Sequence, residues 1–205
     1  MRLSGELGPT GVGRGLPIGG GQSESGLPAP VRFARVDLRT VGFDHPDAQT
    51  LTEQVQQEYV VRYGGIDRSP IDPREFDPPG GLFLVGYLDG KPVGCAGWRT
   101  PPYTLLRPGD AEVKRMYVAP EARGRGLARR MLAALERDAA VAGKIRMVLE
   151  TGLGQPEAIT LYLSAGYTPI PSYGLHREAP GNRCYARSLT VTTGPAPEQV
   201  GEPQP

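Results

Sequence analysis

The chain has 205 residues, 39% of them hydrophobic, which suits one domain with tails better than two domains. Its 23 Lys and Arg residues nearly balance 22 Asp and Glu residues, and this argues against an obligate nucleic-acid binder, which carries a basic excess. Two cysteines, Cys95 and Cys184, exclude a small disulfide scaffold and are expected to be free thiols. The apolar runs are too short to span a bilayer, and the N-terminus lacks the apolar segment of a signal peptide, so we expect a cytoplasmic protein without a membrane partner.

Both ends of the chain are rich in Gly, Pro and polar residues and show no apolar periodicity. Such segments cannot bury enough surface to offset the entropy that ordering them would cost. The sequence therefore predicts disordered tails over residues 1–30 and 191–205, with one folded domain over residues 31–190 between them.

The first half of this domain is predicted to form a strand, a helix and three further strands. A strand over residues 31–36 precedes a helix that begins near Pro46, in which apolar residues recur every four positions from Leu51 to Tyr63. Residues 66–80 contain five Pro or Gly residues and are expected to form an irregular connection. The next three predicted strands, the first two joined by an Asp-Gly turn, are residues 81–88, 92–98 and 111–118.

The second half is predicted to alternate helices and strands. A helix from about Leu127 to Ala142 carries an apolar stripe and stops at Gly143, and a helix from Pro156 to about Ala165 is terminated by Gly166. The remaining predicted strands are residues 145–149, 166–170 and 183–189. This order predicts an α/β fold with a mixed central sheet of about six to seven strands flanked by helices.

The most informative segment, residues 112–128, joins a strand, a glycine-rich loop and a helix. Gly124 and Gly126 lack Cβ atoms, so the backbone can approach a bulky ligand closely. The first N–H groups of the following helix have no partners within it and lie at the positive end of its dipole, which favours an anion. Arg123 and Arg125 add positive charge, so this loop suits a pyrophosphate.

Other interpretations of this loop remain open from the sequence. A Gly-x-Gly segment before a helix also occurs in tight turns that bind nothing. The Arg-Gly-Arg-Gly run shares its composition with disordered RNA-binding segments, but a single copy leading into an amphipathic helix argues against that role. The loop is not a Walker P-loop, because no Gly-Lys-[Ser/Thr] follows, and Arg129 stands where a Rossmann fingerprint requires its third glycine.

The segment Arg123-x-x-Gly126-x-Ala128 matches the [Gln/Arg]-x-x-Gly-x-[Gly/Ala] signature of the GNAT acetyltransferases, and the strand before it resembles the family's fourth strand. The resemblance extends over residues 31–190 and is strongest over residues 111–167. It implies the GNAT fold and an acetyl-CoA-dependent N-acetyltransferase, in which this loop binds the pyrophosphate of acetyl-CoA. The cofactor-binding residues that it implies in the loop are Arg123, Gly124, Arg125, Gly126, Leu127 and Ala128.

A second block, residues 155–167, resembles the family's Asn-x-x-Ala-x-x-Leu-Tyr-x-x-x-Gly-[Phe/Tyr] pattern. Gln155 stands in place of the usual Asn, which keeps a side-chain amide at the cofactor but moves it by one methylene. The resemblance implies that Tyr162 faces the CoA sulfur, where a phenol of pKa about 10 can protonate a departing thiolate whose thiol has a pKa of about 8.5. The alternative is that Tyr162 is a core residue at helical spacing from Ala158 and Ala165.

The resemblance further implies that the strand over residues 112–118 is splayed at a bulge. Its amides would then face the thioester at Met116, Tyr117 and Val118, where backbone donors stabilise the oxyanion formed by attack of the amine. These three residues complete the set of cofactor-binding residues that the resemblance implies.

An alkylammonium of pKa about 10 must lose a proton before it attacks. Glu112 is the first candidate for this base, because it aligns with the glutamate base of histone-acetylating relatives; alternatively it pairs with Lys114 or Arg115. Glu150 is the second candidate, at the carboxyl end of a predicted strand, where ligands collect in α/β sheets, although it could equally cap a turn. Some relatives use a chain of water molecules instead. His176 is expected to be solvated, and no Cys/His spacing predicts a metal site.

The predicted acceptor is a primary amine, either a small molecule or an amino acid, because the domain carries no insert for a peptide groove. The resemblance leaves a homodimer open. A non-catalytic acyl-CoA-binding sensor and a protein N-acetyltransferase are the alternative functions. Candidate residues for the acceptor pocket are Tyr63, Phe76, Trp98, Arg99 and Tyr173.

Overall fold

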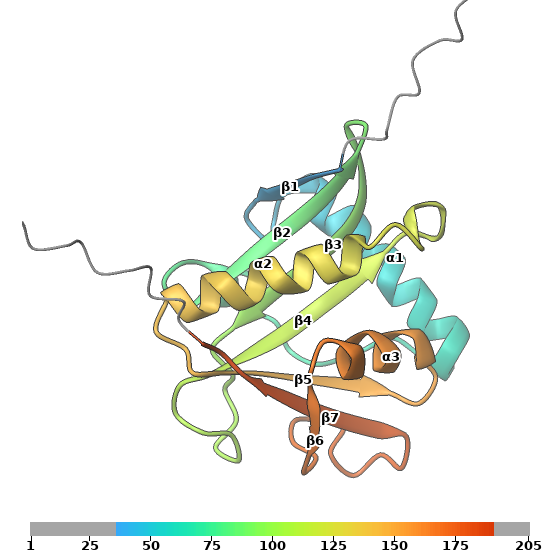
Figure 1. The fold of residues 1–205 in the computed structure, drawn as a ribbon. Helices are drawn as coiled ribbons and strands as arrows, with labels where there is room; N and C mark the ends of the chain where they lie inside the picture. Colours follow the sequence, from blue (N-terminus) through green and yellow to red (C-terminus); the bar gives the residue numbers. More distant parts are fainter. Residues whose placement is uncertain (1–35, 191–205) are drawn as a thin grey trace, which may run out of the picture. The chain divides into compact units, whose positions relative to one another are not determined.

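The computed structural model describes residues 36–190, which form a seven-stranded mixed sheet with helices on both faces (Figure 1). The predicted α/β fold is confirmed. The predicted tails over residues 1–30 and 191–205, and most of the strand predicted over residues 31–36, lie outside the described residues. No helix within residues 36–190 is long and apolar enough to cross a membrane.

The elements follow the predicted order. The strands are β1 (Val36–Thr40), β2 (Gly81–Leu88), β3 (Lys91–Arg99), β4 (Asp110–Val118), β5 (Arg146–Gly152), β6 (Thr168–Ile170) and β7 (Asn182–Ser188). The helices are α1 (Pro46–Tyr63), α2 (Leu127–Val141) and α3 (Pro156–Ser164), with short 3-10 turns at Pro73–Phe76 and Pro120–Ala122. The strand predicted over residues 145–149 begins and ends later than expected, because Ile145 is 60% exposed and the pairing of β5 continues to Gly152.

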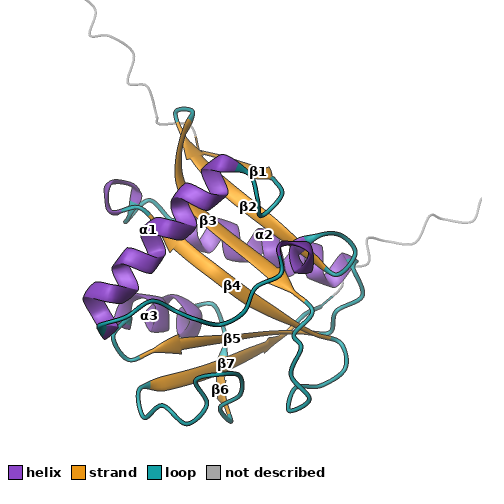
Figure 2. Cartoon of the chain, turned by 180° about the vertical axis from the view of Figure 1, so that it is seen from behind, coloured by secondary structure: helices purple, strands orange, loops and turns teal. Residues whose placement is uncertain are grey.

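The sheet has the order β1-β2-β3-β4-β5-β7-β6. The β4–β5 pair is parallel and the other pairs are antiparallel. The parallel ladder holds three residue pairs and ends at Glu112 opposite Val148. Beyond this point the two strands separate toward α1 and α3 (Figure 2). The sheet is therefore split at its centre, on the side where α3 begins.

A bulge interrupts β4 just beyond the last pair with β5. Cys95 of β3 lies opposite Tyr117 and Gly97 lies opposite Lys114, so Arg115 and Met116 together oppose a single residue of β3. Arg115 has a φ of +54°, a left-handed conformation that is uncommon for a residue with a Cβ atom. The bulge that the family resemblance implied is confirmed, and it ends the regular alternation of side chains along β4.

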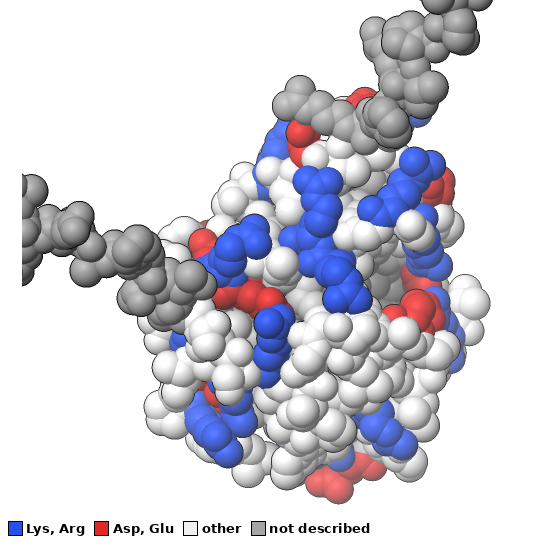
Figure 3. All heavy atoms as spheres, in the orientation of Figure 1, with Lys and Arg blue, Asp and Glu red and all other residues white. Residues whose placement is uncertain are grey.

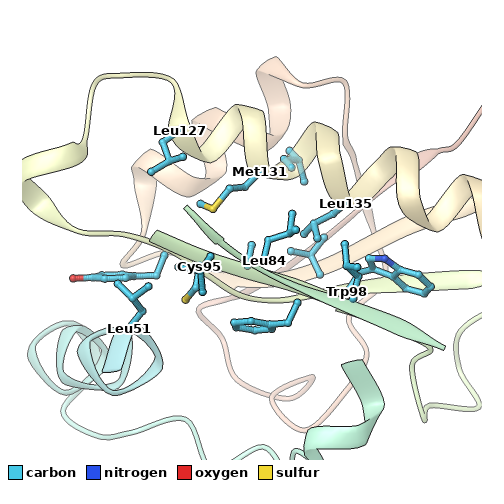
Figure 4. Packing of buried hydrophobic residues seen from close by; sticks show 14 of the residues in the cluster. Leu51, Leu84, Cys95, Trp98, Leu127, Met131 and Leu135 are labelled. Carbon is cyan, nitrogen blue, oxygen red and sulfur yellow. The ribbon is translucent and has the colours of Figure 1, made fainter. Parts of the chain in front are cut away.

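Apolar side chains are buried on both faces of the sheet, where α1 covers one face and α2 covers the other (Figure 4). The predicted apolar stripe of α2, which includes Met131, Leu132 and Leu135, is buried against β2, β3 and β4. Leu51 and Val55 of α1 are each 1% exposed on the opposite face. Burial of each such side chain contributes about 1.5–3 kcal/mol, so these two helices hold the loops at their ends in fixed positions against the sheet.

The two cysteines are buried, and both are free, as expected. Burial raises the pKa of Cys95 to about 12, which keeps its thiol protonated. Cys184 packs in a smaller cluster with Val148 and Tyr173 on the β5–β7 part of the sheet.

Candidate active site

The loop before α2 presents backbone N–H groups that have no partner inside the helix. Gly126 precedes the first helical residue, and neither a capping side chain nor an acidic residue in the first turn satisfies these groups. The first bond that closes a helical turn runs from the Arg130 N–H to the Gly126 carbonyl at 3.1 Å. The N–H groups of residues 127–129 therefore lie at the positive end of the helix dipole, where an anion is favoured.

The two glycines of this loop are required by its backbone conformation. Gly124 and Gly126 have φ values of +74° and +73°, which residues with a Cβ atom rarely adopt. A Cβ atom at either position would meet no atom of the described chain within 4 Å, apart from its immediate neighbours in sequence. The loop therefore borders open space, in agreement with the expectation that a ligand can approach its backbone closely.

The contacts of Arg123 differ from the expectation that its charge faces a ligand. Its Nε donates a hydrogen bond to the Val118 carbonyl at 2.9 Å, and its Nη2 donates to Glu58 Oε2 at 2.7 Å. Arg62 Nε also donates to Glu58, at 3.0 Å. Arg123 therefore ties the loop to the end of β4 and to α1, while Glu58 offsets its charge.

Other basic side chains supply positive charge near the loop. Arg125 in the loop and Arg129 and Arg130 in the first turn of α2 are exposed. Lys and Arg side chains gather over α2 in Figure 3. This basic surface supports an anionic ligand at the adjacent helix terminus.

A first cavity, of about 310 Å³, lies beside this loop, between α1, the end of β4 and the start of α3. The predicted cofactor-binding residues that line it are Met116, Tyr117, Val118, Arg123, Gly124, Gly126, Leu127, Ala128 and Gln155. Arg125 and Tyr162, also predicted for the cofactor, are not among its lining residues. The structure thus brings the two sequence blocks of the predicted site to one cavity.

A second cavity, of about 550 Å³, lies on the other side of the bulge in β4. It is bordered by the end of α1, the loop after it, the end of β5 and the loop before β7. Residues 113–115 of β4 line the second cavity, residues 116–118 line the first, and Gln155 lines both. The two cavities therefore meet where β4 and β5 have separated, and backbone groups of β4 that β5 no longer pairs are available there to a ligand.

Asp67 and Arg115 form an ion pair in the wall of the second cavity. Arg115 Nη1 lies 2.5 Å from Asp67 Oδ2, and His176 Nε2 lies 3.3 Å from Asp67 Oδ1. Burial by itself would raise the pKa of Asp67, but the charge of Arg115 and hydrogen bonds from Ser69 outweigh it and hold that pKa well below its usual range. His176, expected to be solvated, is thus partly exposed but paired across two loops.

Glu150, at the end of β5, also lines the second cavity. Burial raises the pKa of its carboxyl above the usual value, while nearby Lys114 and His176 only partly oppose the shift. Within the described part of the chain, no side chain hydrogen-bonds or ion-pairs with Glu150. A partly buried carboxylate with a raised pKa can accept a proton from a ligand in the cavity.

Glu112 has different surroundings and lines neither cavity. Its side chain is fully buried, with Arg99 Nε at 2.9 Å from Oε2 and Lys114 Nζ at 3.8 Å from Oε1. Arg99, directly opposite on β3, also pairs with Glu75 at 2.5 Å. These contacts favour the structural alternative for Glu112, although its main partner is Arg99 rather than Lys114 or Arg115.

Tyr162 lies on α3 and is 5% exposed. Its ring packs against that of Tyr167, with centroids 5.7 Å apart. Burial raises the pKa of Tyr162 well above its ordinary value, so its hydroxyl stays protonated. Tyr59, which lines the second cavity, also has a pKa raised by burial, to about 12.

Of the candidate acceptor-pocket residues, Tyr63 lines the second cavity. The others, Phe76, Trp98, Arg99 and Tyr173, are buried in the interior. No sequence pattern pointed to Asp67 or to the side-chain role of Arg115, because the two residues lie 48 positions apart and meet only through the bulge. No group of His, Cys, Asp and Glu side chains among residues 36–190 is arranged to hold a metal ion.

Residues 48–167 match the family model described as the acetyltransferase (GNAT) family. This match covers more than half of the chain, and the protein belongs to the GNAT acetyltransferase family. The resemblance drawn from the two sequence blocks is confirmed.

Relatives and solved structures agree with this membership. A protein of Azospirillum brasilense named IAA acetyltransferase is 36% identical over 127 residues, which are 60% of this chain and 80% of the relative. A Klebsiella pneumoniae structure described as an acyl-CoA N-acyltransferase has a TM-score of 0.60 and 25% identity, covering 76% of this chain and 98% of its own. The Salmonella typhimurium protein yncA, solved with its cofactor acetyl-CoA, has a TM-score of 0.57 and 22% identity, covering 79% and 98%.

Proposed function

We propose that this protein transfers an acetyl group from acetyl-CoA to a primary amine of a small molecule or amino acid. The observation that carries the proposal is the meeting of two cavities at the split between β4 and β5. One cavity opens onto the free N–H groups of α2, and the other contains an unpaired, partly buried carboxylate. Membership of the acetyltransferase family and the acetyl-CoA bound to yncA support the same donor.

The first cavity has the donors that a CoA pyrophosphate requires. The N–H groups of residues 127–129 are not capped by a side chain. Gly124 and Gly126, both with a positive φ, leave the backbone beside these groups uncovered. Exposed arginines beside it add positive charge. Met116, Tyr117 and Val118 would hold the pantetheine arm along β4, with Gln155 on the opposite wall. Bound there, acetyl-CoA supplies an acetyl group activated as a thioester.

Glu150 and the backbone of β4 would act on the amine and on the acetyl carbonyl, respectively. Glu150 accepts the proton of the incoming ammonium, a role that its raised pKa and lack of a partner support better than the buried ion pair of Glu112. Backbone N–H groups near Met116 donate to the carbonyl oxygen as negative charge develops on it. Because burial raises the pKa of Tyr162 further above that of a thiol, Tyr162 would stabilise the leaving sulfur chiefly by donating a hydrogen bond.

An assay of CoA release tests the proposal. Purified protein is incubated with acetyl-CoA and a panel of amino acids, arylalkylamines, diamines and aminoglycosides, and free thiol is measured against the amine-free rate. At least one amine is expected to accelerate thiol release, with an acetylated product found by mass spectrometry.

The same measurements separate the alternative functions. Calorimetric binding of acetyl-CoA without thiol release from any amine would favour a sensor and contradict the proposal. Acetylation confined to a co-expressed protein partner would favour a protein N-acetyltransferase.

A further inference from the structure

The charged side chains of the second cavity are balanced in sign. Lys114 and Arg115 line it from β4, and Asp67 and Glu150 line it from the α1 loop and from β5. Arg62 also lines the cavity, but Glu58 and Glu157, which line the first cavity, pair with it. Two cations and two anions therefore face one space whose size suits a small molecule.

Three consecutive residues of β4, Val113, Lys114 and Arg115, line this cavity where the bulge begins. In a regular strand neighbouring side chains point to opposite faces. The left-handed φ of +54° at Arg115 breaks this alternation. A residue held in such a conformation carries a steric cost that the surrounding structure must offset, and such residues concentrate at functional sites.

Arg115 retains donor capacity beyond its pair with Asp67. Its side chain is 5% exposed, and only Nη1 contacts the Asp67 carboxylate. Its Nε is buried and has no hydrogen-bond partner within residues 36–190. An unpaired buried donor on a guanidinium is costly, and a carboxylate oxygen would satisfy it with a charge-assisted hydrogen bond.

Lys114 is likewise incompletely paired. Its ammonium lies 3.8 Å from Glu112 Oε1, which is beyond hydrogen-bonding distance, while Glu112 is held by Arg99 through its other oxygen. The Lys114 side chain is 11% exposed. Lys114 therefore has Glu112 as an ion-pair partner but no hydrogen-bonded acceptor among the described residues, so its ammonium can donate to an anionic ligand.

We propose that the second cavity binds a zwitterionic acceptor, an amino acid whose carboxylate is held by Lys114 and Arg115 and whose amine is directed to Glu150. The inference rests on the proposed acetyl transfer and names the acceptor class for it. A diamine would place a second cation beside Lys114 and Arg115, and a neutral amine would leave the Arg115 Nε unpaired. A zwitterion carries one negative and one positive group, and the cavity has both basic and acidic side chains to receive them.

The ammonium group of the amino acid gives one proton to Glu150, which passes it to solvent. The nitrogen forms a bond to the acetyl carbon as the carbon–sulfur bond breaks, and the electron pair of that bond leaves with sulfur. The nitrogen loses a second proton as the amide forms, and this proton converts the thiolate to free CoA thiol.

The test compares each L-amino acid with its own carboxamide, which keeps the amine and the side chain but removes the negative charge. CoA release is measured for each pair with wild-type protein. For the preferred side chain, kcat/KM is expected to be roughly ten- to a hundred-fold higher for the amino acid, the difference typical of a lost charge-assisted hydrogen bond. Calorimetry in the presence of CoA is expected to show the same order of affinities without turnover.

Lys114→Met tests the assignment of the carboxylate site. This variant is expected to raise KM for the amino acid by roughly tenfold or more and to bring the ratio between acid and amide toward one. Lys91→Met, which removes the same charge from an exposed position that lines neither cavity, is the control and is expected to keep the wild-type ratio. Arg115 is not substituted, because loss of its pair with Asp67 would also weaken the fold.

The outcomes distinguish this inference from the function on which it rests. Carboxamides or diamines used as well as amino acids, or a Lys114→Met variant with the wild-type preference, would overturn the zwitterion site but leave amine acetylation standing. No CoA release with any amine would overturn both proposals.

Discussion

At the residue scale, two carboxylates near the split of the sheet occupy different electrostatic environments. Glu112 is fully buried and held by Arg99, so its charge is compensated inside the protein. Glu150 lines a cavity, and burial raises its pKa. A general base needs access to the amine and a pKa closer to the working pH, and Glu150 meets both conditions.

Glu150→Gln is expected to lower kcat by about 10²- to 10⁴-fold, the range typical of a lost general base, and to remove the acid limb of the pH–rate profile. In the wild type this limb falls as the pH drops through the raised pKa of Glu150, because the protonated carboxyl cannot accept a proton. Glu112→Gln is the comparison and is expected to keep the acid limb. An unchanged pH profile for Glu150→Gln would contradict its assignment as the base.

Glu150→Gln, which is expected to lower activity, should nevertheless raise the stability of the fold at neutral pH. A carboxyl whose pKa is higher in the folded than in the unfolded protein makes the folded state less stable at pH values above that raised pKa. Glu150→Gln is therefore expected to raise Tm at pH 7, and the gain should disappear below about pH 4, where the wild-type carboxyl is protonated in both states. Thermal unfolding at both pH values measures this; a lower Tm at pH 7 would show that Glu150 has a structural role.

Tyr162→Phe is expected to lower kcat while leaving acetyl-CoA affinity within about twofold, because the lost hydroxyl would act on the departing sulfur rather than on the bound cofactor. Tyr167→Phe is the matched control, since its ring packs against Tyr162 but its hydroxyl bonds to Glu136 at 3.0 Å. Steady-state kinetics and calorimetry provide the two quantities. Equal kcat values for the two variants would show that the Tyr162 hydroxyl does not act on the departing sulfur.

Asp67 is expected to stabilise the fold through its pair with Arg115. Its pKa is lower in the folded protein than in the unfolded chain, so its contribution is present above about pH 4 and is lost as the pH falls toward the lowered value. Asp67→Asn should therefore cost about 3–5 kcal/mol at pH 7, since it leaves Arg115 buried without a counter-ion. Chemical unfolding at pH 7 measures the loss, and a cost below about 1 kcal/mol would show that the ion pair with Arg115 does not stabilise the fold.

At the element scale, α2 positions the loop through its packing. Leu135 is fully buried on the side of α2 that packs on the sheet, and Val141 in the last turn of α2 is 85% exposed. Leu135→Ala is expected to lower the free energy of unfolding by about 2–5 kcal/mol, whereas Val141→Ala, on the same helix, should change it by about 0.5 kcal/mol or less. Equal effects of the two substitutions in urea unfolding would contradict the described packing of α2.

The helices and strands were largely predictable because their signals are local. The four-residue period of α1, the stripe of α2 and the Asp-Gly turn between β2 and β3 appear directly in the sequence. The end of β5 was misplaced because its last residues, Glu150 to Gly152, are polar or small and do not resemble a buried strand. A polar strand end beside a ligand cavity lacks the apolar run by which buried strands are recognised.

At the scale of the whole molecule, the site depends on contacts that no short segment encodes. The two blocks of sequence that carry the family resemblance do meet at the first cavity, as predicted. The second cavity, in contrast, is built from four separate segments, within residues 59–67, 113–115, 150–155 and 176–182. Its ion pair joins Asp67 to Arg115 across a bulge whose position follows from the pairing of β3 with β4. The sequence thus predicted the family and most of the residues that line the first cavity, but few of those that line the second.

The proposed function depends above all on the backbone at the start of α2, which is expected to hold the diphosphate of acetyl-CoA. Calorimetric titration with acetyl-CoA of the wild type, Gly126→Leu and Gly143→Leu tests it directly. Both glycines have a positive φ, and a Cβ atom at either would have only its sequence neighbours within 4 Å in the part of the chain that the structure describes. Gly143, however, lies beyond the opposite end of α2. Both variants should therefore carry a similar folding cost, which circular dichroism can verify.

The wild type and Gly143→Leu are expected to bind acetyl-CoA with similar affinity, while Gly126→Leu is expected to bind it at least roughly tenfold more weakly, a loss of about 1.4 kcal/mol or more. A folded Gly126→Leu variant with wild-type affinity, or a wild type that gives no heat with acetyl-CoA, would show that this backbone does not hold the diphosphate.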